Sequence, residues 1–207
     1  MKKFYELAEM PRLMEEGPVT YFGCPFHLRV DDSIIHYIAD KLIWDAPYRA
    51  LLFTNSHLFT MELFDKLKST YAQYSYEYDY SPENYCFVDK SDGGAQKSEV
   101  QLFNFSGKKE LSKKVKKGYY DRAFFHFVDE DISGRLSQVV DLAKSLSFFT
   151  LDSDTSLFYQ LGEEGMDSFY RLYDDKSNKK INELEAEDII DAEKERLWKG
   201  LFEKNIK

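Results

Sequence analysis

The fold is decided by residues 49–73, which read RALLFTNSHLFTMELFDKLKSTYAQ. Residues 49–54 form a short apolar run between polar neighbours, a pattern typical of a strand that is buried on both faces of a sheet. Asn55 or Ser56 can cap the helix that follows. Four large side chains of this helix recur every fourth residue and share one face: Phe59, Leu63, Leu67 and Tyr71. The stretch therefore predicts a strand–helix unit of an α/β fold.

A second unit of the same kind starts at residues 122–128, which read RAFFHFV and predict another buried strand. Ser133 can cap a helix running to about residue 146, and residues 147–151 then return as a strand. Asp31 or Asp32 can cap a further helix that ends before Pro47. More strands are expected at 19–30, 73–81, 84–89, 99–105 and 156–161, with helices at 2–16 and from Glu163.

Alternating strands and helices predict an α/β domain over residues 1–175, with helices packed on a mixed sheet. Closely spaced strands between residues 73 and 105 indicate antiparallel hairpins added to a parallel core. Residues 176–207 are expected to form a polar linker and a long C-terminal helix over 182–205. That helix should pack on the domain or on a second subunit through Leu197, Trp198, Leu201 and Phe202.

The net charge and the number of cysteines indicate which partners and which cellular location to expect. The chain has 28 basic and 37 acidic residues, a net charge of -9, which opposes a nucleic-acid duplex and favours a basic protein partner. Cys24 and Cys86 are too few for a disulfide framework, so a reducing, cytoplasmic location is expected. The sequence has neither a signal-peptide pattern nor an apolar run long enough to cross a membrane.

Four tyrosines recur at every second position, Tyr74, Tyr76, Tyr78 and Tyr80. In a strand over 73–81 they would lie on one face, because alternate side chains point the same way. Tyrosine suits a partly solvated contact surface, because each buried hydroxyl needs a hydrogen-bond partner. We therefore expect this face to be partly exposed and to bind a partner; the alternative is a sheet face covered by a helix.

Six lysines occur within the ten residues Lys108–Lys117. A run of this kind could hold phosphates, and together with tyrosine stacking it would suit a nucleic-acid binder. Leu111 and Val115 lie four positions apart, so a short helix would bury them and leave the lysines in water. A solvated helix face is the alternative interpretation of the run.

Acidic residues follow two of the predicted strands: Asp129 and Asp131 after one, and Asp152 and Asp154 after the other. If these strands are parallel neighbours, the four carboxylates gather at one edge of the sheet, where α/β proteins bind ligands. Carboxylate oxygens are the ligands that Mg²⁺ prefers. The four aspartates are therefore a candidate metal site; acidic turns that act only as caps are the alternative.

No P-loop, GxSxG, HExxH or GxGxxG motif is present, so the sequence offers no catalytic residue. The acidic charge, the tyrosines and this lack of a motif favour a non-enzymatic protein-binding domain without a cofactor, such as an inhibitor, an immunity protein, an antitoxin-like protein or an adaptor. A Mg²⁺-dependent enzyme that cleaves phosphoesters with the clustered aspartates is the first alternative, and a nucleic-acid binder is the second.

Overall fold

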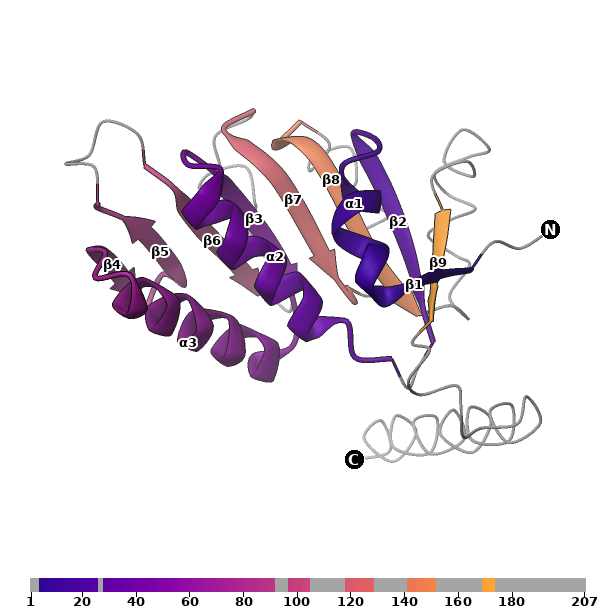
Figure 1. Cartoon of the computed structure of the whole chain (residues 1–207), viewed down its shortest axis with the longest axis horizontal. Helices are drawn as coiled ribbons and strands as arrows, with labels where there is room; N and C mark the ends of the chain where they lie inside the picture. Colours follow the sequence, from indigo (N-terminus) through magenta and orange to yellow (C-terminus); the bar gives the residue numbers. More distant parts are fainter. Residues whose placement is uncertain are drawn as a thin grey trace, which may run out of the picture.

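The computed structural model describes residues 4–25, 28–91, 97–104, 118–128, 141–151 and 169–173. These residues form a nine-stranded sheet in the order β1-β9-β2-β8-β7-β3-β6-β5-β4 (Figure 1). The strands are β1 (Phe4–Glu6), β2 (Val19–Cys24), β3 (Arg49–Thr54), β4 (Tyr78–Ser81), β5 (Cys86–Asp89), β6 (Glu99–Asn104), β7 (Tyr120–His126), β8 (Ala143–Leu151) and β9 (Phe169–Tyr173). The α/β prediction is confirmed.

Seven neighbouring strands, from β1 to β6, pair in parallel, while β5 pairs antiparallel with both β6 and β4. The hairpin of β4 and β5 is thus the predicted antiparallel addition to a parallel core. The predicted strands at 49–54 and 122–128 are confirmed as central members, since β3 and β7 pair with each other and have neighbours on their other sides. Both are almost wholly buried.

Within the described residues, three helices pack on one face of this sheet: α1 (Met10–Met14), α2 (Asp31–Trp44) and α3 (His57–Gln73) (Figure 1). Ser56 caps α3 as predicted, because its hydroxyl accepts a hydrogen bond from the Phe59 amide at 3.1 Å. The helices bury their apolar stripes against the sheet, and this core includes Ile34, Ile38, Leu42, Leu63, Leu67, Leu52, Phe124 and Phe149. Burial of these stripes supplies most of the stability of such helices.

A row of aromatic rings runs across the other face of the sheet. Successive ring centroids lie 5.9 Å apart for Phe103 and Phe53, 4.8 Å for Phe53 and Phe125, 4.4 Å for Phe125 and Phe148, and 4.9 Å for Phe148 and Tyr21. These five residues come from five adjacent strands, so the row fixes the register of β6, β3, β7, β8 and β2. Both faces of the central strands are therefore packed.

The N-terminal segment corrects the prediction of a helix over 2–16. Residues 4–6 form β1, a 3-10 helix covers Leu7–Glu9, and α1 begins only at Met10. Pro11 lies in the first turn of α1, where its missing N–H costs nothing, and does not interrupt a longer helix. β1 pairs with β9, more than 160 positions away, so local sequence gave no signal for it.

Two further expectations are wrong. Residues 143–146, predicted as the end of a helix, begin β8, because pairing with β2 and β7 on both sides outweighs their local preference. Residues 169–173 form β9, where a helix was expected from Glu163. The predicted helix from Ser133, the strand at 156–161 and the C-terminal linker and helix over 176–207 lie outside the described residues.

The four tyrosines do not share one strand face. Tyr74 ends α3 and Tyr76 lies in the turn that follows, so only Tyr78 and Tyr80 belong to β4. The structure makes α3 longer and the strand shorter than the period-two pattern predicted. Tyr74 and Tyr76 are exposed, whereas Tyr78 and Tyr80 are half-buried against the core below α3.

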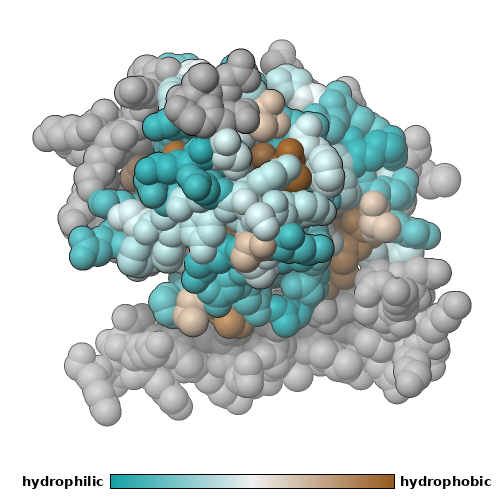
Figure 2. Space-filling view, turned by 60° about the vertical axis from the view of Figure 1, so that its left-hand side comes forward, coloured by the Kyte–Doolittle hydropathy of each residue, from teal (hydrophilic) through white to brown (hydrophobic). Residues whose placement is uncertain are grey.

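The end of the molecule that carries β4 and α3 is mostly hydrophilic, with small hydrophobic patches separated by polar residues (Figure 2). Within the described part of the chain, no helix is both long and apolar enough to cross a bilayer.

Candidate functional site

The carboxyl ends of β2, β8, β7 and β3 meet at one edge of the sheet, because these four adjacent strands are parallel. In open α/β sheets, ligands bind outside the carboxyl ends of the strands. The described strand ends at this edge are Cys24, Thr54, His126 and Leu151. We therefore take this edge as the candidate site.

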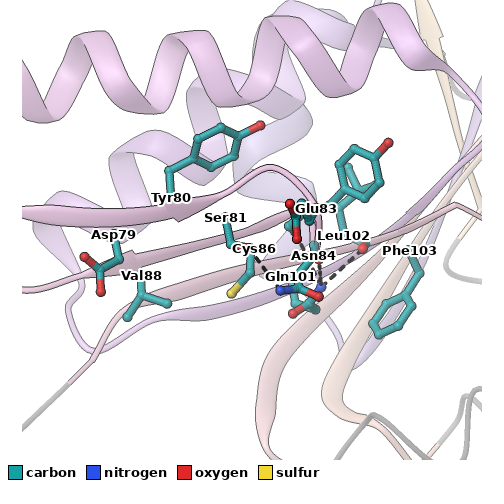
Figure 3. Close-up of a pocket in the computed structure, with 11 residues that line it drawn as sticks. Asp79, Tyr80, Ser81, Glu83, Asn84, Cys86, Val88, Gln101, Leu102 and Phe103 are labelled. Atoms are coloured by element: carbon teal, nitrogen blue, oxygen red, sulfur yellow. Dashed lines mark hydrogen bonds between the residues drawn. The ribbon is translucent and has the colours of Figure 1, made fainter.

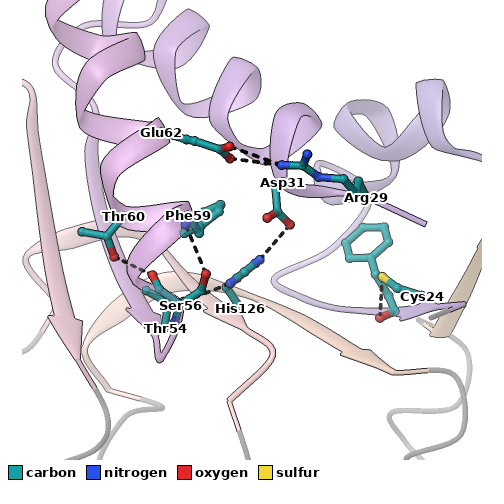
Figure 4. Close-up of polar contacts among 10 residues, drawn as sticks. Cys24, Arg29, Asp31, Thr54, Ser56, Phe59, Thr60, Glu62 and His126 are labelled. Atoms are coloured by element: carbon teal, nitrogen blue, oxygen red, sulfur yellow. Dashed lines mark hydrogen bonds and ion pairs between the residues drawn. The ribbon is translucent and has the colours of Figure 1, made fainter. Parts of the chain in front are cut away.

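His126 is the centre of a polar cluster at the edge (Figure 4). Its Nδ1 lies 3.0 Å from the hydroxyl of Thr54, and its Nε2 lies 3.1 Å from Oδ1 of Asp31, the first residue of α2. The ring stacks on Phe59 with centroids 3.9 Å apart. A carboxylate only accepts, so the neutral imidazole carries its proton on Nε2 and accepts the Thr54 hydroxyl proton at Nδ1.

This cluster is closed to solvent on the sheet side. His126 is 4% exposed and Thr54 is 1% exposed. The Thr54 hydroxyl also accepts a hydrogen bond from the Ser56 amide at 3.0 Å, so the same oxygen ties β3 to the start of α3. The cluster thus fixes β7, β3, α2 and α3 relative to one another, and Thr54 is too buried to act as a nucleophile.

Asp31 remains ionised in this environment. Burial by itself would raise the pKa of this carboxyl, but the hydrogen bond with Nε2 of His126 and the charge of Arg29 outweigh burial and hold the pKa below its usual value. The start of α2 therefore carries a fixed negative charge, and Asp32 adds a second carboxylate in the same turn.

Arg29 is the one basic side chain, histidine apart, among residues 25–30, which connect β2 to α2. Its Nη2 lies 3.2 Å from Oε2 of Glu62 on α3 (Figure 4). The Arg29 side chain is largely exposed, so this ion pair is weak and the guanidinium can exchange partners.

Phe127, the residue directly after β7, has an unusual backbone conformation, with φ at 46°. The left-handed region costs a bulky residue about 1–2 kcal/mol. The Phe127 amide donates to the carbonyl of Phe149 at 3.0 Å, which holds the turn against β8. This hydrogen bond to β8 therefore fixes the direction in which the backbone continues after β7.

The connection between β2 and α2 does not fit phosphates in the manner of a P-loop. That motif needs glycines for close backbone approach and a lysine that reaches the phosphates. Residues 25–30 contain neither glycine nor lysine. Asp31 and Asp32 already place carboxylates at the start of α2, where a phosphate would otherwise be attracted. A phosphate group would meet like charge there.

The predicted metal ligands Asp129, Asp131, Asp152 and Asp154 lie outside the described residues. The condition attached to that prediction is met, however, because β7 and β8 are parallel neighbours with His126 opposite Phe149. Among the residues that the structure describes, no three His, Cys, Asp or Glu side chains gather closely enough to hold a metal ion.

A hollow of about 890 Å³ is lined by residues of β4, β5, β6 and the turn between β4 and β5 (Figure 3). Gln101 fills part of it and donates to the carbonyl of Asn84 at 2.8 Å. Burial, with a smaller effect of Glu99, raises the pKa of the Cys86 thiol to about 11. A thiol with this pKa is a poor nucleophile, so the hollow does not suit cysteine chemistry.

No protein-family model matches the sequence, and no curated protein matches it. The structure is similar to the ATPase domain of the large terminase of Thermus phage P74-26, in a mutant form, with a TM-score of 0.56 and 8% identity over 83% of this chain and 80% of that one. It is also similar to the large terminase of bacteriophage D6E in complex with ADP, with a TM-score of 0.53 and 9% identity over 88% of this chain. This chain spans 48% of the D6E protein. A weaker match, with a TM-score of 0.43, is the Phi-28 gp11 DNA packaging motor.

The fold is therefore like that of terminase ATPase domains. The prediction of a non-enzymatic protein-binding domain, whether inhibitor, immunity protein, antitoxin or adaptor, is wrong on this comparison. It depended on a missing motif and on a four-tyrosine strand face that the structure does not contain. The sequence predicted an α/β sheet, but without a P-loop motif it gave no indication of a likeness to ATPase domains.

Sequence reasoning also missed the cluster of Asp31, His126 and Thr54. These residues are far apart in the sequence, and no local motif connects His126 with Asp31 or Thr54. A signal was present nonetheless, since Thr54 and His126 are polar residues at the carboxyl ends of two predicted buried strands. Parallel pairing of those strands brings the two side chains together.

Proposed function

We propose that this protein binds a nucleoside triphosphate as its Mg²⁺ complex at the carboxyl edge of β2, β8, β7 and β3. The observation that carries the proposal is the parallel pairing of β7 with β8, in a sheet like those of ATPase domains. In the sequence, Asp129, Glu130 and Asp131 follow β7 closely, and Asp152 and Asp154 follow β8. Their carboxylates have the chemistry that Mg²⁺ prefers.

The metal ion is the main attachment point in this proposal, because the start of α2 repels phosphate. Arg29 is the nearby cation best able to turn from Glu62 towards a phosphate. A P-loop lysine contributes a charged hydrogen bond of about 1.5–3 kcal/mol, and its absence lowers affinity roughly 10- to 100-fold. Binding should therefore be weak and strictly dependent on the metal ion.

The test is a titration of the protein with a fluorescent ATP analogue, in excess Mg²⁺ and again in excess EDTA. Saturable binding that EDTA abolishes is expected, and Asp129→Asn with Glu130→Gln should abolish it as well. Asp65→Asn with Asp79→Asn serves as the matched control, since it removes two acidic charges from exposed positions on α3 and β4. Equal affinity in Mg²⁺ and EDTA, or no binding in either, would contradict the proposal.

A nucleic-acid partner is a second candidate, and the lysine-rich run Lys108–Lys117 favours it. The net charge of -9 opposes general binding to a polyanion, so contacts confined to this run should be few. Each phosphate contact contributes roughly 0.7 to the slope of log affinity against log salt for single strands. Binding of a single-stranded oligonucleotide should show a slope of about four or less, and replacing the six lysines by glutamine should remove it.

A further inference from the structure

An exposed stripe runs along α2, opposite its buried face. Asp32, His36, Asp40 and Trp44 recur every fourth residue, and all four are exposed. This stripe lines a groove of about 470 Å³ whose other wall comes from α1 and the segment before it, through Leu7, Ala8 and Pro11. Figure 1 shows α1 and α2 on the same face of the sheet.

Trp44 ends the groove and is 68% exposed, the largest exposed fraction among the big hydrophobic side chains of the described chain. Its ring meets Tyr74 edge to face at 5.9 Å, and Tyr74 stacks with Tyr76 at 5.8 Å. These two tyrosines are 42% and 40% exposed. Tryptophan and tyrosine are the residues that most often anchor protein interfaces, so a row of three exposed rings points to a macromolecular partner.

The charge of the groove decides which partner fits. Four carboxylates line it and only one lysine, Lys41, opposes them. Lys41 is already engaged, since its Nζ lies 3.0 Å from Glu15 and 2.5 Å from Asp45. Asp32 and Asp40 have no ion-pair partner in the part of the chain that the structure describes. Two carboxylates and an exposed indole are thus available to cations, which are attracted to both.

Asp32 and Asp40 are eight residues apart on one helix face, which places them about 12 Å apart along the axis. An extended peptide covers that distance in about four residues. We propose that the groove binds an extended basic segment of a partner protein, with Lys or Arg side chains on Asp32 and Asp40 and the following residues against Trp44. This proposal does not depend on the nucleotide site, because it uses none of the residues that follow β7 and β8.

The test uses the full chain carrying Trp198→Phe, so that Trp44 is its only tryptophan. The probe is a synthetic peptide with arginine at every fourth position between glycine and serine residues, titrated at physiological salt while Trp44 fluorescence is recorded. Saturable one-to-one binding is expected. Asp32→Asn with Asp40→Asn should raise the Kd about five- to tenfold, from the loss of two exposed ion pairs. Trp44→Ala, followed by calorimetry, should raise it by a similar factor.

The matched control is Asp65→Asn with Asp79→Asn, which removes the same charge from positions outside the groove and should change the Kd less than twofold. Thermal unfolding of each variant shows that it is folded. The proposal is overturned by no saturable binding, by an equal loss of affinity in both double variants, or by binding of a single-stranded oligonucleotide in place of the peptide. Self-association that Trp44→Ala abolishes would also overturn it, because the occupant would then be a second copy.

Discussion

Replacing Thr54 by valine tests the polar cluster at the carboxyl edge with almost no change of side-chain shape. The substitution removes one hydroxyl, and with it the 3.0 Å contact to Nδ1 of His126 and the 3.0 Å hydrogen bond from the Ser56 amide. His126 is 4% exposed, so water cannot replace the lost partner. A buried polar group left unsatisfied costs about 1–3 kcal/mol.

We therefore expect Thr54→Val to lower the free energy of unfolding by about 2 kcal/mol and the melting temperature by about 4–8 °C. Urea unfolding followed by circular dichroism measures the change, and an unchanged m-value shows that the native and unfolded states are otherwise the same. Thr70→Val on α3 is the control, because the Thr70 side chain makes no hydrogen bond within the described structure. Its expected effect is below about 0.5 kcal/mol.

A double-mutant cycle with His126→Phe isolates the contact between the two side chains. Phenylalanine keeps a ring against Phe59 but removes both nitrogens. The coupling energy between Thr54→Val and His126→Phe should be about 1–2 kcal/mol. Additivity within about 0.5 kcal/mol, or an equal effect of Thr54→Val and Thr70→Val, would refute the reasoning.

The remaining predictions concern pH, packing and reactivity. The pKa of Asp31 is held below its usual value of about 3.9, so the ionised carboxylate stabilises the fold above that pH. This contribution disappears as the pH falls through the pKa of the folded state. In thermal unfolding, the difference in stability between wild type and Asp31→Asn should be full at pH 7 and should vanish at strongly acidic pH. Phe87→Ala should cost about 3–5 kcal/mol in urea unfolding because Phe87 is fully buried, whereas Tyr85→Ala on the exposed turn should cost less than about 1 kcal/mol. The Cys86 thiol has a pKa of about 11, so alkylation by iodoacetamide should be slow at pH 8 and accelerate as pH rises towards 11; a fast reaction at pH 8 would contradict this.

The strands and helices that could be predicted are those whose buried positions follow from the local pattern of apolar residues. Residues 49–54 and 122–128 are apolar throughout, since both faces of β3 and β7 are covered, and α3 shows its buried side chains at every fourth position. β1 and β9 could not be predicted in this way. They have three and five residues and depend on long-range pairing: β1 pairs with β9, and β9 pairs with both β1 and β2.

The tyrosines show how a correct pattern led to a wrong element. Alternation from Tyr74 to Tyr80 is real, but Tyr71 is fully buried as the last large residue of the α3 stripe, and the helix continues to Gln73. The alternation of tyrosines, which is typical of a strand, therefore begins at the C-terminal end of α3. The acidic residues after β7 and β8 can be read from the sequence, and their role in a metal site stays a prediction. The partnership of Asp31 with His126 required the order of the strands.

The place of β2 in the sheet has a consequence for how the protein is made. β2 lies between β8 and β9, and its Thr20 meets Ser147, a residue 127 positions later. Ribosomes add about 5–20 residues per second, so roughly 6–25 s pass before that partner is synthesised. Until then a nascent chain exposes two unpaired edges of an apolar strand, a known route to aggregation. Such long-range pairing also slows folding. This protein should therefore depend on chaperones while it is being translated, and a chain truncated before residue 141 should be recovered as insoluble material.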